Sequence, residues 1–299
     1  MAMHEFLEKH ATAEMSIDEI NALVKEHMDE INGSIPRPKT EKDAKTAEDF
    51  LDLAEQAVEE GDDAKALRLA RKAKKLDPEN LDAELMTIRL GEKDPLNALK
   101  RLRLAVDQGK RQLEKAGYFK EEYLGEFWGV LETRPYMRVR SEYLSALKDF
   151  GMLRQAACEG EDMIRLNTMD NLGIRFELMH IYAALEEPVL AETLLSKYSE
   201  HDEGQMLLPI VLLYYRLGET DKAKMYLKRL ANNVKETRIF FRDFLDNRMD
   251  RKAKEVYQNG GYRPFTEEEL IITCYENDEI YKRVPTFFLW AADVLKVKR

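Results

Sequence analysis

The chain has 299 residues, of which 44% are hydrophobic and 35% charged, and its formal net charge is −10. This length suits two ordinary domains or one extended repeat protein, and the composition excludes wholesale disorder. The acidic charge disfavours nucleic acid as a partner. Cys158 and Cys274 lie far apart without a CxxC pair, which indicates neither a disulfide framework nor a zinc site, so we expect two buried, reduced thiols.

Residues 1–45 predict one helix and a linker. The start, "MAMHEFLEKHATAEMS", lacks the basic and then apolar stretches of a secretion signal. Ser16 and Glu19 have the spacing of a capping box, and Gly33 ends the expected helix before the Pro-rich segment "SIPRPKTEKD". His4 and His10 are six positions apart and fall on opposite helix faces, so they do not form a metal-binding pair.

Residues 46–78 predict a hairpin of two helices. Thr46 is placed to cap a helix that reaches Glu60, Gly61 suits a left-handed stop, and a second helix closes at Pro78. Short side chains recur where two antiparallel helices must approach closely. The pattern is carried by Phe50, Leu53, Ala54, Ala57, Ala66, Ala70, Ala73 and Pro78. Its spacing resembles the tetratricopeptide repeat (TPR).

The alanine equivalent to Ala66 recurs along the chain at spacings of 32, 58, 35 and 32 residues, at Ala98, Ala156, Ala191 and Ala223. We therefore predict about five helical hairpins over 46–234, two of them weak, with an irregular segment near 110–135. No stretch alternates as a β-strand does. The predicted fold is an all-α, TPR-like α-solenoid, a right-handed superhelix of helical hairpins whose first helices form a concave binding surface.

A basic run in the second helix of the first hairpin permits two interpretations. It contains Lys65, Arg68, Arg71, Lys72, Lys74 and Lys75, and it faces an acidic first helix. The run could recruit an acidic partner, or it could be an ordinary solvated face. Glu48 and Asp52 occupy positions where co-chaperone TPR domains carry Lys and Asn, so the carboxylate clamp of those domains is absent.

Residues 125–140, "GEFWGVLETRPYMRVR", differ in composition from the helical sequence around them. We expect "GEFWG" to close one helix and Pro135 to begin the next. One interpretation is that Trp128 and Tyr136 fill a gap between repeats, with Glu126 or Glu132 neutralising the arginines. The other is a ligand-binding cluster, since aromatic residues and arginines dominate binding hot spots. The candidate partner contacts are Trp128, Arg134, Tyr136, Arg138 and Arg140.

Residues 235–299 lose the repeat pattern and predict a C-terminal helical cap over the last repeat. Thr266 and Glu269 have capping-box spacing, and "PTFFLWAADVL" is an apolar helix through which chains could pair as homo-oligomers. The longest apolar run, "MLLPIVLLYY" at 206–215, is about half of what a bilayer crossing requires. We expect a cytoplasmic protein without membrane contact.

Three segments are similar to a family of bacterial TPR proteins related to the suppression-of-tumorigenicity-seven proteins. They are "FWGVLETRPYMRVR", "LNTMDNLGIR" at 166–175, and the ending "TEEELIITCYENDEIYKRVPTFFLWAADVL". The likeness covers roughly residues 120–295; Thr168 and Met169 depart from the family pattern in the second segment. The membrane segments of the eukaryotic members have no counterpart here. The resemblance implies a repeat scaffold and no reaction.

The sequence thus favours a non-enzymatic scaffold or adaptor that binds a protein or peptide segment, with no cofactor. No phosphate-binding, nucleophile-elbow or metal motif occurs, and no spacing brings titratable groups together. The alternative is a peptide-sensing transcription regulator of TPR type. Such a regulator needs a basic reading head of about three helices, whereas one acidic helix precedes the linker.

Overall fold

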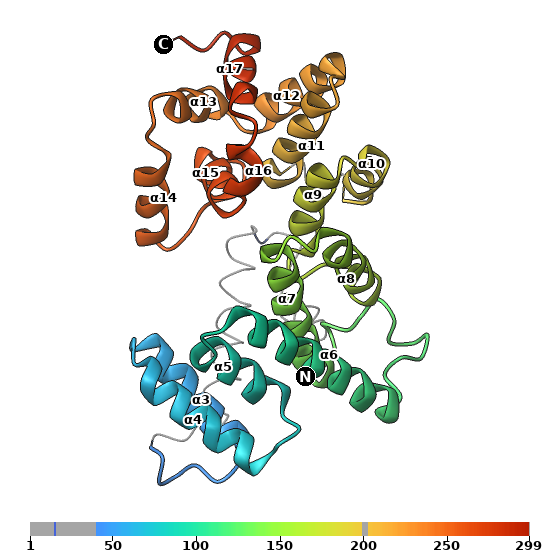
Figure 1. Cartoon of the computed structure of the whole chain (residues 1–299), viewed down its shortest axis with the longest axis vertical. Helices are drawn as coiled ribbons and strands as arrows, with labels where there is room; N and C mark the ends of the chain where they lie inside the picture. The colour runs from blue at the N-terminus through green and yellow to red at the C-terminus, as the bar shows by residue number, and fades with distance from the viewer. Residues whose placement is uncertain (1–14, 16–39, 199–202, 299) are drawn as a thin grey trace. The chain divides into compact units, whose positions relative to one another are not determined.

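The structure, a computed structural model, describes residues 15, 40–198 and 203–298. These residues form fifteen α-helices and one 3-10 helix, with isolated β-bridges but no strand, which confirms the all-α prediction. The chain divides into two compact units, Met1–Gly91 and Glu92–Arg299, and each is described by itself. The helix and linker predicted before residue 40, with His4 and His10, lie outside the described residues (Figure 1).

The first unit contains α3 (Ala47–Glu59), α4 (Asp63–Leu76) and α5 (Leu81–Gly91). Thr46 begins α3 with a capping box: its hydroxyl accepts from the Asp49 amide at 3.1 Å, and the Asp49 carboxylate accepts from the Thr46 amide at 2.9 Å. Gly61, with φ of 78°, makes the left-handed turn into α4. The predicted start of α3 and its glycine stop are therefore confirmed.

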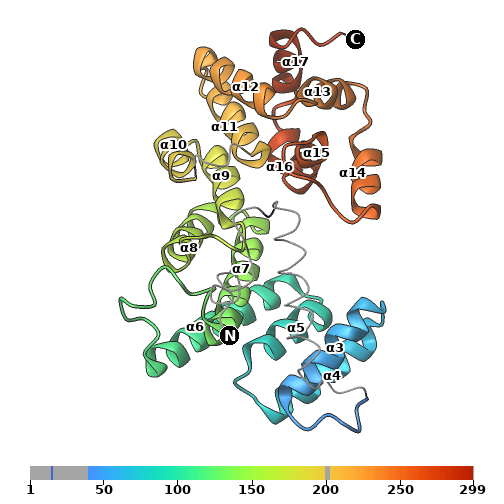
Figure 2. The same ribbon diagram turned by 180° about the vertical axis from the view of Figure 1, so that it is seen from behind.

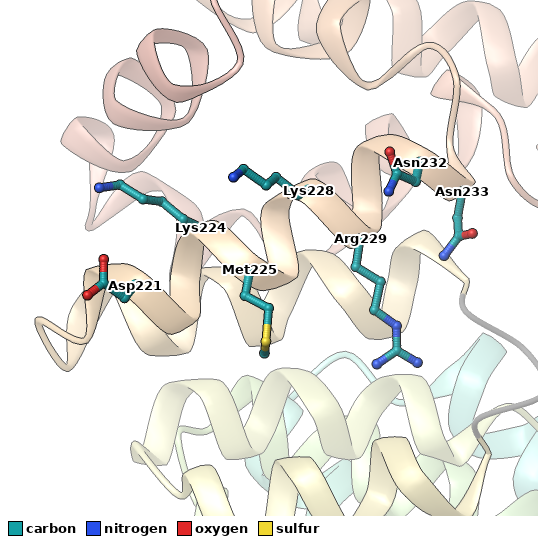
Figure 3. Close-up of a pocket in the computed structure, with 7 residues that line it drawn as sticks. All are labelled: Asp221, Lys224, Met225, Lys228, Arg229, Asn232 and Asn233. Carbon is teal, nitrogen blue, oxygen red and sulfur yellow. The ribbon is translucent and has the colours of Figure 1, made fainter.

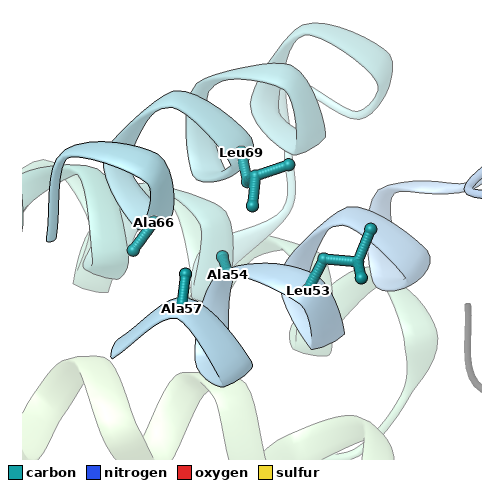
Figure 4. Close-up of a cluster of buried hydrophobic side chains, with 5 residues drawn as sticks. All are labelled: Leu53, Ala54, Ala57, Ala66 and Leu69. Atoms are coloured by element: carbon teal, nitrogen blue, oxygen red, sulfur yellow. The ribbon is translucent and has the colours of Figure 1, made fainter. Parts of the chain in front are cut away.

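Alanines bring α3 and α4 into close contact. Ala54 and Ala57 of α3 and Ala66 of α4 are fully buried, and Leu53 and Leu69 close the cluster (Figure 4). Side chains this short let the two helix backbones approach, which is the packing that the TPR-like spacing predicts. α5 packs against α4 and completes the unit.

The second unit begins with the 22-residue helix α6 (Pro95–Ala116), which Gly117 ends in the left-handed conformation. The irregular segment expected near 110–135 therefore comprises residues 117–130 and the 3-10 helix η1 (Leu131–Thr133). "GEFWG" does not close a helix, which corrects our expectation, because α6 ends at Ala116, before that segment begins at Gly125. The next helix begins at Arg134, one residue before Pro135.

Three helical pairs follow in the second unit. They are α7 (Arg134–Asp149) with α8 (Leu153–Leu166), α9 (Ile174–Leu185) with α10 (Pro188–Lys197), and α11 (Gly204–Arg216) with α12 (Thr220–Asn233). Their second helices carry the recurrent alanines Ala156, Ala191 and Ala223, all fully buried, whereas Ala98 near the start of α6 is half-buried. Hairpins with a TPR-like alanine contact thus recur in both units.

The remaining helices are α13 (Thr237–Leu245), α14 (Met249–Gln258), α15 (Glu267–Glu276), α16 (Asp278–Lys282) and α17 (Pro285–Val294). α15 packs against α11 and α13, and α17 packs against α13. Figures 1 and 2 both show α15 and α16 beside α9 and α11, on the side away from α10. The C-terminal helices therefore lie against the first helices of the hairpins.

Contacts of the C-terminal helices extend beyond the last hairpin. The Lys148 ammonium of α7 donates to the Asn277 side chain at 3.2 Å, and the Tyr281 hydroxyl lies 3.3 Å from the His180 ring of α9. Because α11 is covered on both sides, every residue from Gly204 to Tyr214 is buried. This double cover explains the apolar run at 206–215, since a helix that is apolar all round is a buried helix.

Two further expectations need correction. Cys158 is exposed on α8, and only Cys274 is buried. Thr266 precedes α15 as predicted, but its hydroxyl donates to the Arg263 carbonyl at 2.6 Å instead of capping the helix. The Glu269 carboxylate accepts from the amides of Gln205 at 3.0 Å and Phe265 at 2.6 Å, so it caps the start of α11.

Candidate functional site

Two loops of the second unit, 117–130 and 167–173, are joined by backbone hydrogen bonds. The Phe127 amide donates to the Leu166 carbonyl at 3.0 Å, and the Thr168 amide donates to the Gly125 carbonyl at 2.9 Å. Gly125 has φ of 97°, and a Cβ there would lie 3.3 Å from the Thr168 methyl carbon, so the close approach requires glycine. Two of the segments that carry the family resemblance therefore lie side by side.

Trp128 and Arg134 form the outer part of the predicted cluster. The Arg134 Nε donates to the Trp128 carbonyl at 2.7 Å, and its guanidinium lies 5.5 Å from the indole ring centroid. Both side chains are half-buried, as is that of Arg138 one turn further along α7. The structure thus places these three residues, of the five predicted, where solvent reaches part of each side chain.

Tyr136 and Arg140 point the other way, into the protein, and each is 3% exposed. Arg140 forms ion pairs with Glu159 and, at 2.9 Å, with Asp162, and its guanidinium lies 5.3 Å from the Tyr136 ring. Burial raises the pKa of Tyr136 to about 12. Burial alone would lower the pKa of Arg140, but Glu159 outweighs it and holds that pKa above its usual value. These two residues fit the gap-filling interpretation, although acids on α8, not Glu126 or Glu132, pair with Arg140.

Large apolar side chains are exposed just after the first loop and on the second. Leu131 in η1 is 68% exposed and Met169 is 72% exposed. Exposed apolar residues beside tryptophan and arginine have the composition of a protein-binding surface. Composition alone did not single out Leu131 and Met169, because the hydrogen bonds that connect their segments join residues far apart in the chain.

The second resemblance segment also orders the chain after α8. The Asp170 carboxylate accepts from the amides of Ile174 at 2.7 Å and Arg175 at 3.0 Å, which caps α9. The Arg175 guanidinium contacts Asp170 at 2.9 Å and Glu203 at 3.0 Å. This network connects the start of α9 to the start of α11. Asp170 and Arg175 of this segment therefore have a structural role.

Two grooves lie between elements of the second unit. One, of about 420 Å³, runs between α7 and α8; it is bordered by Arg140, Tyr143, Leu147, Arg154, Gln155, Cys158, Glu159 and Asp162. The other, of about 350 Å³, lies where the α7–α8 turn and α9 meet α15 and α16. Charges of both signs line each groove, so neither favours a ligand of one charge.

A third groove, of about 600 Å³, follows α12 and has a predominantly basic lining (Figure 3). It is lined by Asp221, Lys224, Met225, Lys228, Arg229, Asn232 and Asn233. A fourth, of about 260 Å³, lies between α13 and the C-terminal residues, and its lining is Arg238, Ile239, Arg242, Lys296, Val297 and Lys298. The net charge of the whole chain, −10, conceals both grooves in the sequence.

The basic run of α4 is largely paired within its own unit. The Glu41 carboxylate accepts from Arg68 at 2.8 Å and from Lys72 at 2.6 Å, and these hydrogen bonds lower the pKa of Glu41 to about 2. Lys74 forms an ion pair with Glu84. This pairing favours the interpretation of the run as an ordinary charged surface.

Within the described ranges, no group of three His, Cys, Asp or Glu side chains is arranged to hold a metal ion. The helices of the same residues include none that is both long enough and apolar enough to cross a membrane.

The fold defines the class: an all-α protein built from TPR-like helical hairpins. No family model matches the sequence, and no curated protein matches it significantly. Among solved structures, the chain is similar to one described as "Crystal structure of MamA protein", with a TM-score of 0.46 and 18% sequence identity. That alignment covers 64% of this chain and 92% of the other.

Proposed function

We propose that the protein is a non-enzymatic scaffold that binds a protein or peptide segment at the joined loops of the second unit. The binding surface consists of Trp128, Leu131, Arg134, Arg138 and Met169, and is called the loop surface below. The observation that carries the proposal is the 68% exposure of Leu131, which lies between Trp128 and Arg134 in the chain, and the 72% exposure of Met169 on the loop that backbone hydrogen bonds join to residues 125–127. Apolar side chains at this exposure are stabilised by covering them with a partner.

The proposed site differs from the concave face expected of a solenoid. The chain's own α15 packs against α11, and Tyr281 of α16 contacts His180 of α9, so these helices occupy part of the face that a bound peptide would use. A peptide could reach this face only by displacing Tyr281, which is 2% exposed. The loop surface needs no such displacement, since its side chains already reach solvent.

The first experiment changes the loop surface without disturbing the core. Leu131→Asp combined with Met169→Asp places two charges in an apolar contact, which a partner can accommodate only at a cost of several kcal/mol. We expect affinity purification from lysate, with quantitative mass spectrometry, to show at least a tenfold loss of the specific partners. Leu104→Asp is the matched control, because Leu104 is 66% exposed on α6, away from both loops.

Equal recovery of partners with the double variant and with Leu104→Asp would reject the loop surface. Circular dichroism of both variants establishes that the fold is retained. Crosslinking from position 131 then locates the bound segment on the partner.

The proposal extends to the source and location of the protein and to the pairing of its chains, and one alternative function stands beside it. The likeness of the three quoted segments to bacterial relatives of the suppression-of-tumorigenicity-seven proteins supports a bacterial repeat protein, and a cytoplasmic place for it, which cell fractionation tests. Pairing of chains through the C-terminal helices is supported by Leu289 of α17, which is 47% exposed, and sedimentation equilibrium tests it. The alternative of a peptide-sensing transcription regulator stays a hypothesis that no specific observation favours.

A further inference from the structure

The second unit carries a concentration of positive charge on an acidic protein. Residues 221–242 contain seven basic and two acidic residues, although the whole chain has a net charge of −10. Lys224, Lys228, Arg238 and Arg242 belong to this stretch and line the two basic grooves of α12 and α13. The local charge is therefore opposite in sign to that of the molecule.

The α12 groove presents lysines that face solvent. Lys224 and Lys228 are one helical turn apart and extend to the same side of α12 in Figure 3. The opposite side of α12 packs inward through Ala223, Leu227 and Leu230, which fixes the direction of the lysines. Like charges one turn apart on a helix repel each other, and a bound anion removes that repulsion.

The groove between α13 and the C-terminal residues is lined by four cationic side chains and no carboxylate. Arg238 is held in place because its Nε donates to the Leu295 carbonyl at 3.1 Å. Arg242 lies 3.6 Å from Asp243, but that carboxylate is also paired with Arg248 at 3.1 Å and with Lys252. The positive charge of this groove is thus only partly compensated by the surrounding protein.

Features other than charge select the kind of anion. Met225, which is 54% exposed, lines the α12 groove, and Ile239, 38% exposed, lines the second. Asn232 adds an amide that can both donate to and accept from a peptide backbone. Apolar and amide groups between cations fit a polypeptide with carboxylates and apolar side chains. A long polynucleotide would also meet the acidic remainder of the molecule.

We propose that the basic grooves of α12 and α13 are a docking surface for an acidic peptide segment of a partner protein. Its carboxylates pair with Lys224 and Lys228 in the first groove and with Arg242 and Lys298 in the second. The site is separate from the loop surface and does not depend on it.

The test uses the full chain and a fluorescein-labelled peptide rich in glutamate with a central leucine. Fluorescence anisotropy measures its affinity at several salt concentrations.

We expect Lys224→Glu combined with Lys228→Glu to weaken binding by at least tenfold, and Arg242→Glu combined with Lys298→Glu to do so too. We also expect affinity to fall as salt rises, because exposed charge pairs are screened. Lys93→Glu combined with Lys100→Glu makes the same change of charge at exposed positions outside both grooves, and should bind like the unmodified protein.

Several outcomes would overturn the proposal. One is equal binding of a peptide in which glutamine replaces glutamate, and another is equal loss of affinity in the Lys93/Lys100 control. Tighter binding to a labelled oligothymidylate, or to phosphatidylserine vesicles, would assign the grooves to nucleic acid or to a membrane instead. Failure here leaves the Leu131/Met169 experiment unaffected, so the two sites are judged separately.

Discussion

At the residue scale, His180 is a buried titratable side chain whose pKa is shifted chiefly by burial. Its ring is buried, its Nδ1 lies 2.8 Å from the Phe176 carbonyl, and its Nε2 lies 3.3 Å from the Tyr281 hydroxyl. A neutral ring that donates from Nδ1 to the carbonyl and accepts at Nε2 from the hydroxyl satisfies both contacts. Burial lowers the pKa of His180 to about 4.

This pKa gives the stability of the second unit a defined pH dependence. An unfolded histidine has a pKa of about 6.5, so between pH 6.5 and 4 the unfolded chain binds more protons than the folded one. The contribution of His180 is complete above this range and decreases as the pH falls. From pH 7.5 to 5 we expect a loss of about 2 kcal/mol in the free energy of unfolding.

Urea titration followed by tryptophan fluorescence measures this loss, since both tryptophans, Trp128 and Trp290, belong to the second unit. His180→Gln should reduce the pH dependence by that amount. Tyr281→Phe is the control, because it removes a hydrogen bond but keeps the titrating ring. Unchanged pH dependence in His180→Gln would show that other groups are responsible.

At the element scale, the alanines of the second helices decide how closely each hairpin packs. Ala156 of α8 is fully buried, whereas Ala98 near the start of α6 is half-buried, although the sequence pattern treats both as equivalent. The two alanines differ in burial because neighbouring helices cover the position of Ala156 more completely than that of Ala98. A periodic pattern shows that a position faces other helices, but not how much of it they cover.

The two alanines therefore predict different responses to the same substitution. Ala156→Leu should destabilise the second unit by about 1–3 kcal/mol, because a well-packed contact has no room for three more carbon atoms. Ala98→Leu should cost less than about 1 kcal/mol. The same urea titration checks both values, and equal losses would contradict the difference in packing.

Element ends were predicted unevenly. Thr46 and Gly61 act as predicted, because capping and left-handed turns depend on neighbouring residues. Thr266 and Glu269 show the same spacing, yet Glu269 caps α11 instead. Gln205 and Glu269 are distant in sequence, so local spacing could not reveal that contact.

At the scale of the whole molecule, the C-terminal helices pack against α9 and α11, and first helices of this kind commonly line the binding surface of helical-repeat proteins. Tyr281 inserts against α9, and Lys148 of α7 reaches Asn277. The consequence is that α11 and much of α9 are interior, which leaves loops and outer grooves for partners.

Hydrogen exchange tests this cover directly. Tyr281→Ala removes a large side chain from a buried contact, so the amides of α9 should exchange at least tenfold faster. Tyr257→Ala is the control, because Tyr257 is 49% exposed on α14 in the same C-terminal region. Unchanged exchange in α9 with Tyr281→Ala would show that α16 does not protect it.

The sequence by itself determined the all-α class, the alanine-based hairpins, the start of α3 and the unusual composition of 125–140, because each depends on residues near one another in the chain. It also directed attention to Trp128, Arg134 and Arg138. Only the tertiary structure decided that Tyr136 and Arg140 are interior, that two distant loops join at Gly125, and that α15 and α16 cover α9 and α11. These depend on contacts between residues far apart in the chain, which carry no fixed spacing that a sequence pattern can display.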